Sequence, residues 1–413
     1  MVDNELFINR KVCEVMKDLK IFTSNIEDKA REQINLLLEQ EPFKDCKIRI
    51  MPDVHAGAGC VIGFTGNLGD KVIPNIVGVD IGCGMLCVEL GNIDLDLKKL
   101  DEIIHNSIPS GMNVNDEVYE YFDISKLLCY KELKNKGGWL EKSLCSLGGG
   151  NHFIEVDIDE DNNKYLVIHT GSRNLGKQVA EIYQNKAIEY CSYKEEMKQE
   201  IQDTIKEYKE QGRQQEIQQK LIKIHKKYEG KTKLPKDLCY LEGQLRKDYL
   251  HDMKICQEFA CKNRELIATK IINKLGLYLF IEEHFETIHN YIDFDDNIIR
   301  KGSIKASKGK KVIIPMNMRD GCIIGIGKGN DDWNQSAPHG AGRTMSRNMA
   351  KEKLSMEEYK NSMKNIYTTS VNEETIDEAP MAYKPMEEII EYIKDTVDVV
   401  KIIKPIYNFK ASD

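Results

Sequence analysis

The sequence of 413 residues has no long hydrophobic run and no excess of positive charge. No stretch approaches the roughly 18 consecutive apolar residues of a transmembrane helix, and the first five residues carry acid where a secretory signal carries base. We therefore expect a cytoplasmic protein that does not engage a membrane. A net charge of -8 argues against a protein that binds nucleic acid through bulk electrostatics, but it is compatible with a local basic track inside a cleft.

The sequence also lacks a GxxxxGKS or GxxxxGKT phosphate loop, a dinucleotide-binding glycine fingerprint, an internal repeat and a linker rich in proline or serine. Its 12 cysteines are scattered without an export signal, so we expect most of them to be reduced thiols of the core. Polar motifs lie on both sides of a largely helical segment, residues 177–275, which predicts one α+β domain over residues 1–413 from which helices project. We interpret the charged part of that segment, residues 194–236, as a solvated face.

Hydrophobic periodicity places several elements. Apolar residues between Ile26 and Leu38 recur at helical spacing, Lys47–Met51 is typical of a strand, and a second helix is predicted from Tyr240 to about Leu275. Residues 52–84 are dense in glycine, which favours tight loops. The chain is predicted to close with an amphipathic helix and a tail that ends in IYNFKASD.

The nine histidines are unequally placed. Four lie in helical or charged contexts and are interpreted as surface or core residues: His105, His225, His251 and His284. The other five each follow a strand-like run or sit in a glycine turn, where catalytic and binding residues concentrate: His55, His152, His169, His289 and His339. Five such histidines in one chain indicate a shared site.

Asp80 and Cys83 lie three residues apart across a glycine turn, a spacing that lets a carboxylate and a thiol reach one cation. Taken alone, this motif is better explained by a buried aspartate that caps the turn beside a core cysteine. Together with His152, His169 and His289 it favours a metal site for one ion, or for two if Cys83 bridges them. Ligand softness alone favours zinc.

His339 lies in the motif PHGAGR, where small residues would let backbone amides close on an anion while the imidazole stays reachable. Arg343 and Arg347 are suited to bind phosphate, and an imidazole can attack phosphorus. The alternative is a glycine turn with a supporting histidine. The segments around Asn151 and Glu155, and around Arg173, likewise combine glycines with polar side chains that could bond a base, a ribose or a phosphate.

Taken together, the motifs resemble those of one family, the RtcB family of GTP-dependent RNA ligases. In chain order they are MPDVHAGAG, VGVDIGCGM, SLGGGNHFIEV, VIHTGSR, IHN, RKGSIKA, HGAGRTMSR and DEAPMAYKP, between residues 51 and 385. The resemblance implies an α+β fold with mixed sheets around a central cleft for metal and nucleotide. It also implies that RNA ends with a 3′-phosphate or 2′,3′-cyclic phosphate are joined to 5′-hydroxyl ends, in RNA repair or tRNA splicing.

The resemblance assigns roles to named residues. His339 matches the nucleophile that takes GMP from GTP, and the residues that match the ligands of two manganese ions are Asp80, Cys83 and His152 for one and Cys83, His169 and His289 for the other. The positions that match guanylate contacts are Asn151, Glu155, Asn290, Pro315, Gly340, Ala341, Gly342, Tyr383 and Lys410. Arg173, Arg343 and Arg347 are expected to grip the RNA terminus. The family metal, manganese, disagrees with the softness argument for zinc.

The chain departs from the family at Pro315-Met316-Asn317-Met318-Arg319, where many members have proline followed by Gly-Ser-Met-Gly. Bulkier side chains are therefore expected beside the guanylate, and the tail extends three residues past Lys410, where the family ends. Two other functions fit the same residues: a metal-dependent phosphoesterase or nuclease, and a non-catalytic protein that binds RNA ends. The sequence identifies no activating protein partner.

Overall fold

The largest sheet has seven strands, each antiparallel to its neighbours. The computed structural model describes residues 18–136, 138–277 and 284–411. In spatial order the strands are β11 (Lys311–Asn317), β12 (Gly321–Gly327), β14 (Val397–Lys410), β5 (Phe153–Ile158), β6 (Lys164–Thr170), β4 (Gly84–Gly91) and β7 (His284–Ile288). Successive side chains of a strand face opposite sides, so Glu155 and Asp157 share one face of β5, and Ile154 and Val156 share the other.

The seven-stranded sheet curls until its two outer strands approach each other. The Thr287 hydroxyl on β7 donates a hydrogen bond to the Ile313 carbonyl on β11 at 3.4 Å. The inner face encloses a small apolar cluster of Met85, Cys87, Tyr165, Val167, Ile313, Cys322, Ile324 and Ile403. The sheet therefore resembles a barrel, and the mouth of a barrel is a common place for a ligand site.

The strand ends at the mouth carry the predicted metal ligands. Cys83 immediately precedes β4, His152 immediately precedes β5, His169 is the second-last residue of β6, and His289 immediately follows β7. The register brings these ends together, because Gly84 pairs with both Thr170 and Ile288, and Phe153 pairs with His169. Residues up to 206 positions apart in sequence thus meet at one end of one sheet.

A second sheet of five strands lies beside the first. Its order is β1 (Leu19–Ile21), β2 (Ile48–His55), β3 (Ile62–Asn67), β9 (Ile298–Lys301) and β8 (Asn290–Asp293), with only β1 and β2 parallel. A two-stranded ladder joins β10 (Ser303–Lys305) to β13 (Ser336–Pro338). β13 ends one residue before His339, so this part of the fold carries the predicted nucleophile.

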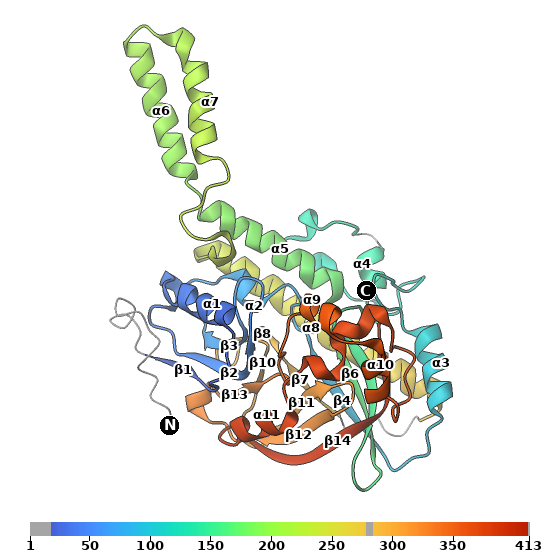
Figure 1. The fold of residues 1–413 in the computed structure, drawn as a ribbon. Helices are drawn as coiled ribbons and strands as arrows, with labels where there is room; N and C mark the ends of the chain where they lie inside the picture. Colours follow the sequence, from blue (N-terminus) through green and yellow to red (C-terminus); the bar gives the residue numbers. More distant parts are fainter. Residues whose placement is uncertain (1–17, 137, 278–283, 412–413) are drawn as a thin grey trace.

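Helices surround the sheets, and two of them, α6 and α7, extend away from the rest of the chain (Figure 1). The helices of the described residues are α1 (Asp28–Leu38), α2 (Pro74–Val77), α3 (Leu97–Ser107), α4 (Trp139–Lys142), α5 (Arg173–Tyr190), α6 (Lys194–Glu210), α7 (Ile217–Tyr228), α8 (Gly243–Leu275), α9 (Arg347–Lys353), α10 (Met356–Ser362) and α11 (Met386–Ile393). The long helix α8 packs on β4 and β6, and its buried Phe259 and Ile267 join the main apolar core with Ile154 and Val156. None of the described helices is long and apolar enough to cross a membrane.

The α+β class and the projecting helices predicted from the sequence are confirmed. Helix α8 begins three residues after the predicted start, and α1 buries the predicted Ile34 and Leu38. One prediction is incomplete and one is wrong. Residues 52–84 contain the predicted loops, but β2 also continues through Pro52 to His55, and β3 and α2 follow. The C-terminal tail is part of a central strand, β14, whose Pro405 sits where the register with β5 shifts.

Arg264 ties α8 to the strand ends at the mouth. Its fully buried guanidinium donates to the carbonyls of Gly82 (2.8 Å) and Thr170 (2.9 Å) and pairs with Glu286 at 2.9 Å. These carbonyls belong to residues next to Cys83 and His169. The helix therefore holds two predicted metal ligands through backbone hydrogen bonds.

We expect Arg264→Leu to lower the free energy of unfolding by about 3–5 kcal/mol, because the change leaves a carboxylate and two buried carbonyls without their donor. Urea unfolding followed by circular dichroism measures the loss. Lys254→Leu, at an exposed position of the same helix, should change it by no more than about 0.5 kcal/mol. Equal stabilities for the two variants would contradict the role given to Arg264.

Candidate active site

Cys83 lies at the centre of a cluster of five potential metal ligands. Its sulfur is 3.5 Å from Nε2 of His152 and 3.3 Å from Nε2 of His169. His152 Nε2 is also 2.9 Å from Asp80 Oδ2, and His169 Nε2 is 3.3 Å from His289 Nε2. The five side chains thus form two groups of three that share the thiol, and within each group the donor atoms lie within 4.8 Å of one another.

The imidazoles are oriented for coordination through Nε2. Nδ1 of His152 lies 2.9 Å from the Leu147 carbonyl, and Nδ1 of His169 lies 3.1 Å from the Asn151 carbonyl. A carbonyl only accepts, so each Nδ1 carries the proton and each Nε2 offers its lone pair to the cluster. Burial lowers the pKa of His169 and of His289 well below the ordinary value, which keeps both rings neutral.

The donor set fits cations. Burial raises the pKa of the Cys83 thiol well above its ordinary value, so this sulfur becomes a thiolate only when positive charge is placed beside it. Asp80 approaches Gly171 so closely that a Cβ on this glycine would lie 2.2 Å from the Asp80 carboxylate oxygen. The glycine of the VIHTGSR motif is therefore required for the carboxylate to reach the cluster.

Arg173 lies next to this cluster, at the first residue of α5. Its guanidinium donates to the Ser146 hydroxyl at 3.0 Å and to the Gly111 carbonyl at 2.8 Å. Burial lowers the pKa of Arg173 to about 10, against the opposing effect of the Asp80 carboxylate. At neutral pH the side chain is still a cation, close to the predicted metal site.

His339 is held by Asp53, a residue that the sequence interpretation did not single out. Nδ1 of His339 is 2.6 Å from Asp53 Oδ2, and the same oxygen accepts the His339 backbone N–H at 3.1 Å. Asp53 is fully buried. The carboxylate accepts the Nδ1 proton, which leaves the lone pair on Nε2. Gly342 has φ of +72° and allows this approach, since a Cβ there would lie 2.6 Å from the Asp53 carbonyl oxygen.

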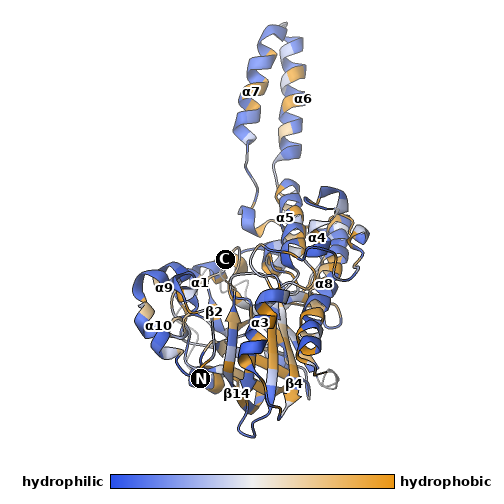
Figure 2. Cartoon of the chain, turned by 90° about the vertical axis from the view of Figure 1, so that its right-hand side faces the viewer, coloured by the Kyte–Doolittle hydropathy of each residue, from blue (hydrophilic) through white to orange (hydrophobic). Residues whose placement is uncertain are grey.

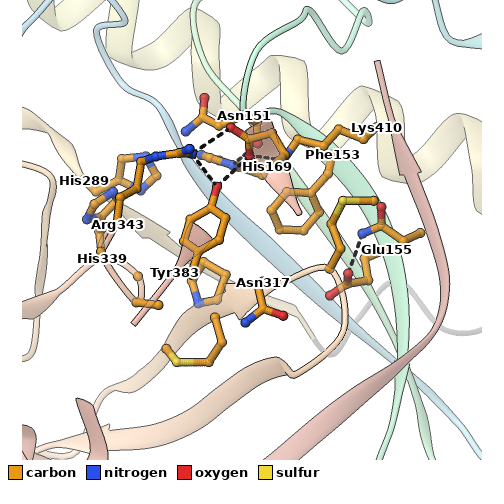
Figure 3. Close-up of a pocket in the computed structure, with 18 of the residues that line it drawn as sticks. Asn151, Phe153, Glu155, His169, His289, Asn317, His339, Arg343, Tyr383 and Lys410 are labelled. Carbon is orange, nitrogen blue, oxygen red and sulfur yellow. Dashed lines mark hydrogen bonds and ion pairs between the residues drawn. The ribbon is translucent and has the colours of Figure 1, made fainter. Parts of the chain in front are cut away.

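A cavity opens beside His339, with about 890 Å³ of space that includes its solvent-filled mouth. In Figure 3 His289 and His339 lie at one end of this cavity and Glu155 lies toward the opposite end. The predicted site residues among its lining are Asn151, Glu155, His169, His289, Pro315, His339, Gly340, Ala341, Gly342, Arg343, Arg347, Tyr383 and Lys410. The cavity is large enough for a nucleotide-sized ligand.

Four polar side chains converge on the buried carboxylate of Glu378, which the sequence interpretation also missed. Lys410 lies 2.5 Å and Tyr383 2.7 Å from Oε2, while Arg347 lies 3.0 Å and Arg343 3.3 Å from Oε1. Burial would raise the pKa of Glu378, but the charges of Lys410 and Arg347 outweigh it and hold the pKa at about 2. The wall next to His339 is therefore cationic, with three positive groups around one anion.

The inner face of the rolled sheet holds a pair of neighbouring acids, Glu155 and Asp157. Their oxygens and the Cys322 sulfur lie within 4.8 Å of one another. Asn408 donates to Glu155 at 2.5 Å, but neither oxygen of Asp157 meets a donor among the described residues. Burial, and then the Glu155 charge, raises the pKa of Asp157 well above its ordinary value. Two carboxyl groups this close in an apolar interior do not both ionise, so one of them keeps a proton.

Five predicted site residues lie outside the cavity lining: Asp80, Cys83, His152, Arg173 and Asn290. The Asn290 side-chain oxygen accepts the Gly302 backbone N–H at 3.0 Å, so this residue braces the loop beside His289. Arg173 lies on the side of Asp80 and His152, away from the cavity wall. The candidate metal ligands therefore adjoin the cavity that His339 faces: His169 and His289 line it, and the other three ligands lie outside its lining near Arg173.

The residues of the departure from the family pattern, Met316, Asn317 and Met318, line the cavity next to Pro315. Met316 and Met318 are 3% and 4% exposed and pack into two different apolar clusters. The Asn317 oxygen accepts the backbone N–H groups of Arg319 and Asp320 at 3.0 Å each. The departure from the family pattern thus places bulkier side chains in the cavity wall, while most of each methionine packs into the protein and Asn317 forms the turn.

The missed residues had weak signals in the sequence. Asp53 lies in MPDVHAGAG, and Glu378 lies in DEAPMAYKP, but each meets its partner only through the fold. Asn408 and Asp157 occupy strand positions with no motif of their own. Alternation along β5 does place Asp157 on the same face as Glu155.

The chain is similar to known proteins over most of its length. A family model described as tRNA-splicing ligase RtcB matches residues 38–128 and 129–411. A protein of Escherichia coli strain ATCC 25922, RNA-splicing ligase RtcB1, is 29% identical, with 95% of this chain and 97% of the relative covered. RNA-splicing ligase RtcB of strain K12 is 28% identical over the same shares, and tRNA-splicing ligase RtcB of Nanoarchaeum equitans is 25% identical over 86% and 85%.

The raised pKa of Asp157 predicts a dependence of stability on pH. An unfolded aspartate loses its proton at about pH 4. Between that pH and the raised pKa of the folded state, the folded chain binds one proton more than the unfolded chain. The free energy of unfolding contributed by this group therefore falls as pH rises, by up to about 1.4 kcal/mol per pH unit.

We expect the free energy of unfolding of Asp157→Asn, relative to that of the wild type, to increase between pH 4.5 and 7.5 when both are measured by urea unfolding. Asp161→Asn, at an exposed position, is the control. A difference that is constant across this range would contradict the proton-bound pair.

Proposed function

The chain belongs to the RtcB family, and on that premise we propose that it is an RNA ligase that works through a histidine–GMP intermediate on His339. The substrates are an RNA end with a 3′-phosphate or 2′,3′-cyclic phosphate, a 5′-hydroxyl RNA end, and GTP. The observation that carries the proposal is the hydrogen bond of 2.6 Å between buried Asp53 and Nδ1 of His339, at the edge of a nucleotide-sized cavity. We treat residues 1–413 as one catalytic domain.

The Asp53–His339 pair supports nucleophilic attack. With the Nδ1 proton held by the carboxylate, Nε2 attacks the α-phosphorus of GTP, the N–P bond forms, and the bond from phosphorus to pyrophosphate breaks. The ring gains positive charge in this step, and the Asp53 carboxylate stabilises it. GMP then passes from Nε2 to the RNA 3′-phosphate, and the 5′-hydroxyl displaces GMP to complete the phosphodiester.

The cavity suggests how GTP lies. Guanine presents N–H donors on one edge, and Glu155 offers a carboxylate at the far end from His339. The backbone of Gly340, Ala341 and Gly342 lines the side next to the nucleophile and is suited to the phosphates. Tyr383, Lys410 and Asn151 lie between these ends. Asn290 stays a proposed guanylate residue that acts through the loop beside His289.

We propose two divalent cations, manganese by analogy with the family. Asp80, Cys83 and His152 would hold one, and Cys83, His169 and His289 would hold the other. When bound, the cations would neutralise negative charge on the triphosphate and on the leaving pyrophosphate. Soft thiolate and imidazole ligands would also bind zinc, so the metal that supports guanylylation has to be measured.

The arginines are proposed to bind the RNA 3′-end. Arg173 lies on the metal-cluster side, and Arg343 and Arg347 lie in the cavity wall. Arg347 is 44% exposed at its side chain and can exchange part of its pairing with Asp377 and Glu378 for a phosphate. A metal-dependent phosphoesterase would use the same arginines but would not need a nucleophilic histidine.

The decisive test of this function is transfer of label from α-labelled GTP to the protein in the presence of manganese. We expect acid-labile, alkali-resistant label on the wild type and none on His339→Ala. Asp53→Asn should label more slowly by about two to four orders of magnitude, because an amide donor facing Nδ1 moves the ring proton to Nε2. His105→Ala, at an exposed histidine of α3, should label normally. Wild type that is folded and metal-loaded but takes no label would favour a phosphoesterase or a binding protein.

The shared thiol predicts how metal content depends on single ligands. After dialysis against manganese, inductively coupled plasma mass spectrometry should find about two ions per wild-type chain. Asp80→Ala removes a donor from one group and should leave about one ion, whereas Cys83→Ala removes a donor from both and should leave less than one. Cys46→Ser, at a half-buried cysteine outside the cluster, should keep two. Two ions in Cys83→Ala would show that the groups do not share this ligand.

A further inference from the structure

The helices α6 and α7 form a hairpin that extends away from the rest of the chain in both Figure 1 and Figure 2. Its two helices pack on each other, with Ile224 of α7 and Thr204 of α6 buried. The chain enters it from α5 and leaves it toward α8, and the base is closed by pairing of Ser192 with Thr232. The proposed ligation gives no role to this hairpin.

The second half of the hairpin concentrates positive charge in an acidic protein. Residues 217–236 contain seven lysines, one glutamate and no other charged residue, a net charge of +6 without histidine. Because the whole chain carries -8, the remaining residues together carry a net charge of -14. This separation of charge within one chain is what would attract a polyanion to the hairpin alone.

The lysines of α7 are exposed and largely free. Lys220, Lys223 and Lys227 follow at i, i+3 and i+7, so they lie along one side of the helix, and Lys226 is next to that side. Lys227 pairs with Glu200 of α6 at 2.6 Å. Within the described parts of the chain, Lys220, Lys223 and Lys226 have no carboxylate within ion-pair distance. Lys223 and Lys226 therefore form no ion pair within the described chain, and the charge of Lys220 acts on the Glu200 carboxylate only from beyond ion-pair distance.

Helix α5 connects this surface to the candidate active site. It begins at Arg173, beside Asp80, and ends at Tyr190, four residues before α6 begins. Its 18 residues span about 27 Å, the rise of on the order of eight to ten base pairs. A base-paired RNA whose end lies at the candidate metal ligands can therefore reach the hairpin with its backbone about one helical turn from that end.

We propose that the lysine side of α7 is a second RNA-binding surface, which contacts the phosphate backbone of the substrate at a distance from the ends that are joined. The inference rests on the proposed RNA ligase function. RNA fits better than an acidic protein because the surface consists of separated lysine point charges on a polar helix that Figure 2 shows as mainly hydrophilic. Such contacts are independent of base sequence and weaken with salt.

The test uses the full-length protein with Lys220, Lys223 and Lys226 all changed to Gln. The matched control changes three exposed lysines of α6, Lys198, Lys206 and Lys209, to Gln, which removes the same charge from the same hairpin. Binding of fluorescent single-stranded RNA of 6 and of 30 nucleotides, each with a 3′-phosphate, is measured by anisotropy at several concentrations of potassium chloride. A triple change of the α7 lysines to Arg checks that charge, and not the lysine itself, is needed.

We expect the α7 Gln variant to bind the 30-nucleotide RNA at least about tenfold more weakly. The slope of the logarithm of affinity against the logarithm of salt concentration should become shallower by about 0.7 per lost phosphate contact. Binding of the 6-nucleotide RNA and formation of histidine–GMP should not change, and the α6 control and the Arg variant should stay within about twofold of wild type. Equal weakening by the α7 and α6 changes, or unchanged binding of the long RNA, would overturn the inference. Histidine–GMP formation is measured separately, by transfer of label from α-labelled GTP. A wild-type protein that takes no label would refute the proposed function and not the role of the hairpin.

Discussion

The Cys83 sulfur is the contact on which the candidate active site depends, because it lies between the His152 and His169 rings and belongs to both groups of metal ligands. Its position follows from strand register: a slip of one residue between β4 and β6 would turn His169 from the inner face to the outer face. Arg264 secures that register from behind the sheet. The positions of the candidate metal ligands thus follow from how one sheet rolls and from the helix that covers it.

Charge is distributed unevenly around the cavity, so that its different parts are suited to different parts of a ligand. The end near the candidate metal ligands holds the neutral imidazoles of His169 and His289, and the adjoining wall holds three cations around Glu378. The far end holds Glu155 beside Asp157, a carboxyl group that keeps its proton. A ligand that carries phosphates at one end and hydrogen-bond donors at the other matches this order. In the proposed function, an acidic chain binds RNA through local positive charge in the cavity wall, at Arg173 and on the lysine side of α7.

Sequence patterns located what depends on local periodicity and missed what depends on long-range contact. The helix expected over Tyr240–Leu275 was found almost in full, because its apolar residues recur at the helical period. Strand β14 was read as a tail, since its proline and lysines are unlike a central strand until a bulge accommodates them. Histidines in glycine turns indicated the site. Asp53, however, contacts His339 from 286 residues away in the sequence, and Glu378 contacts its lysine and arginines only in the folded chain. No local signal encodes such pairs.

The most direct test of this account is the position of manganese in the folded protein. Crystals grown with manganese, measured at its absorption edge, give anomalous peaks that locate each ion independently of activity. The account predicts two peaks, one on each side of the Cys83 sulfur, with the second near His289 and within reach of a nucleotide bound at His339. A single peak away from Cys83, or an ion bound instead between Glu155 and Asp157, would contradict it.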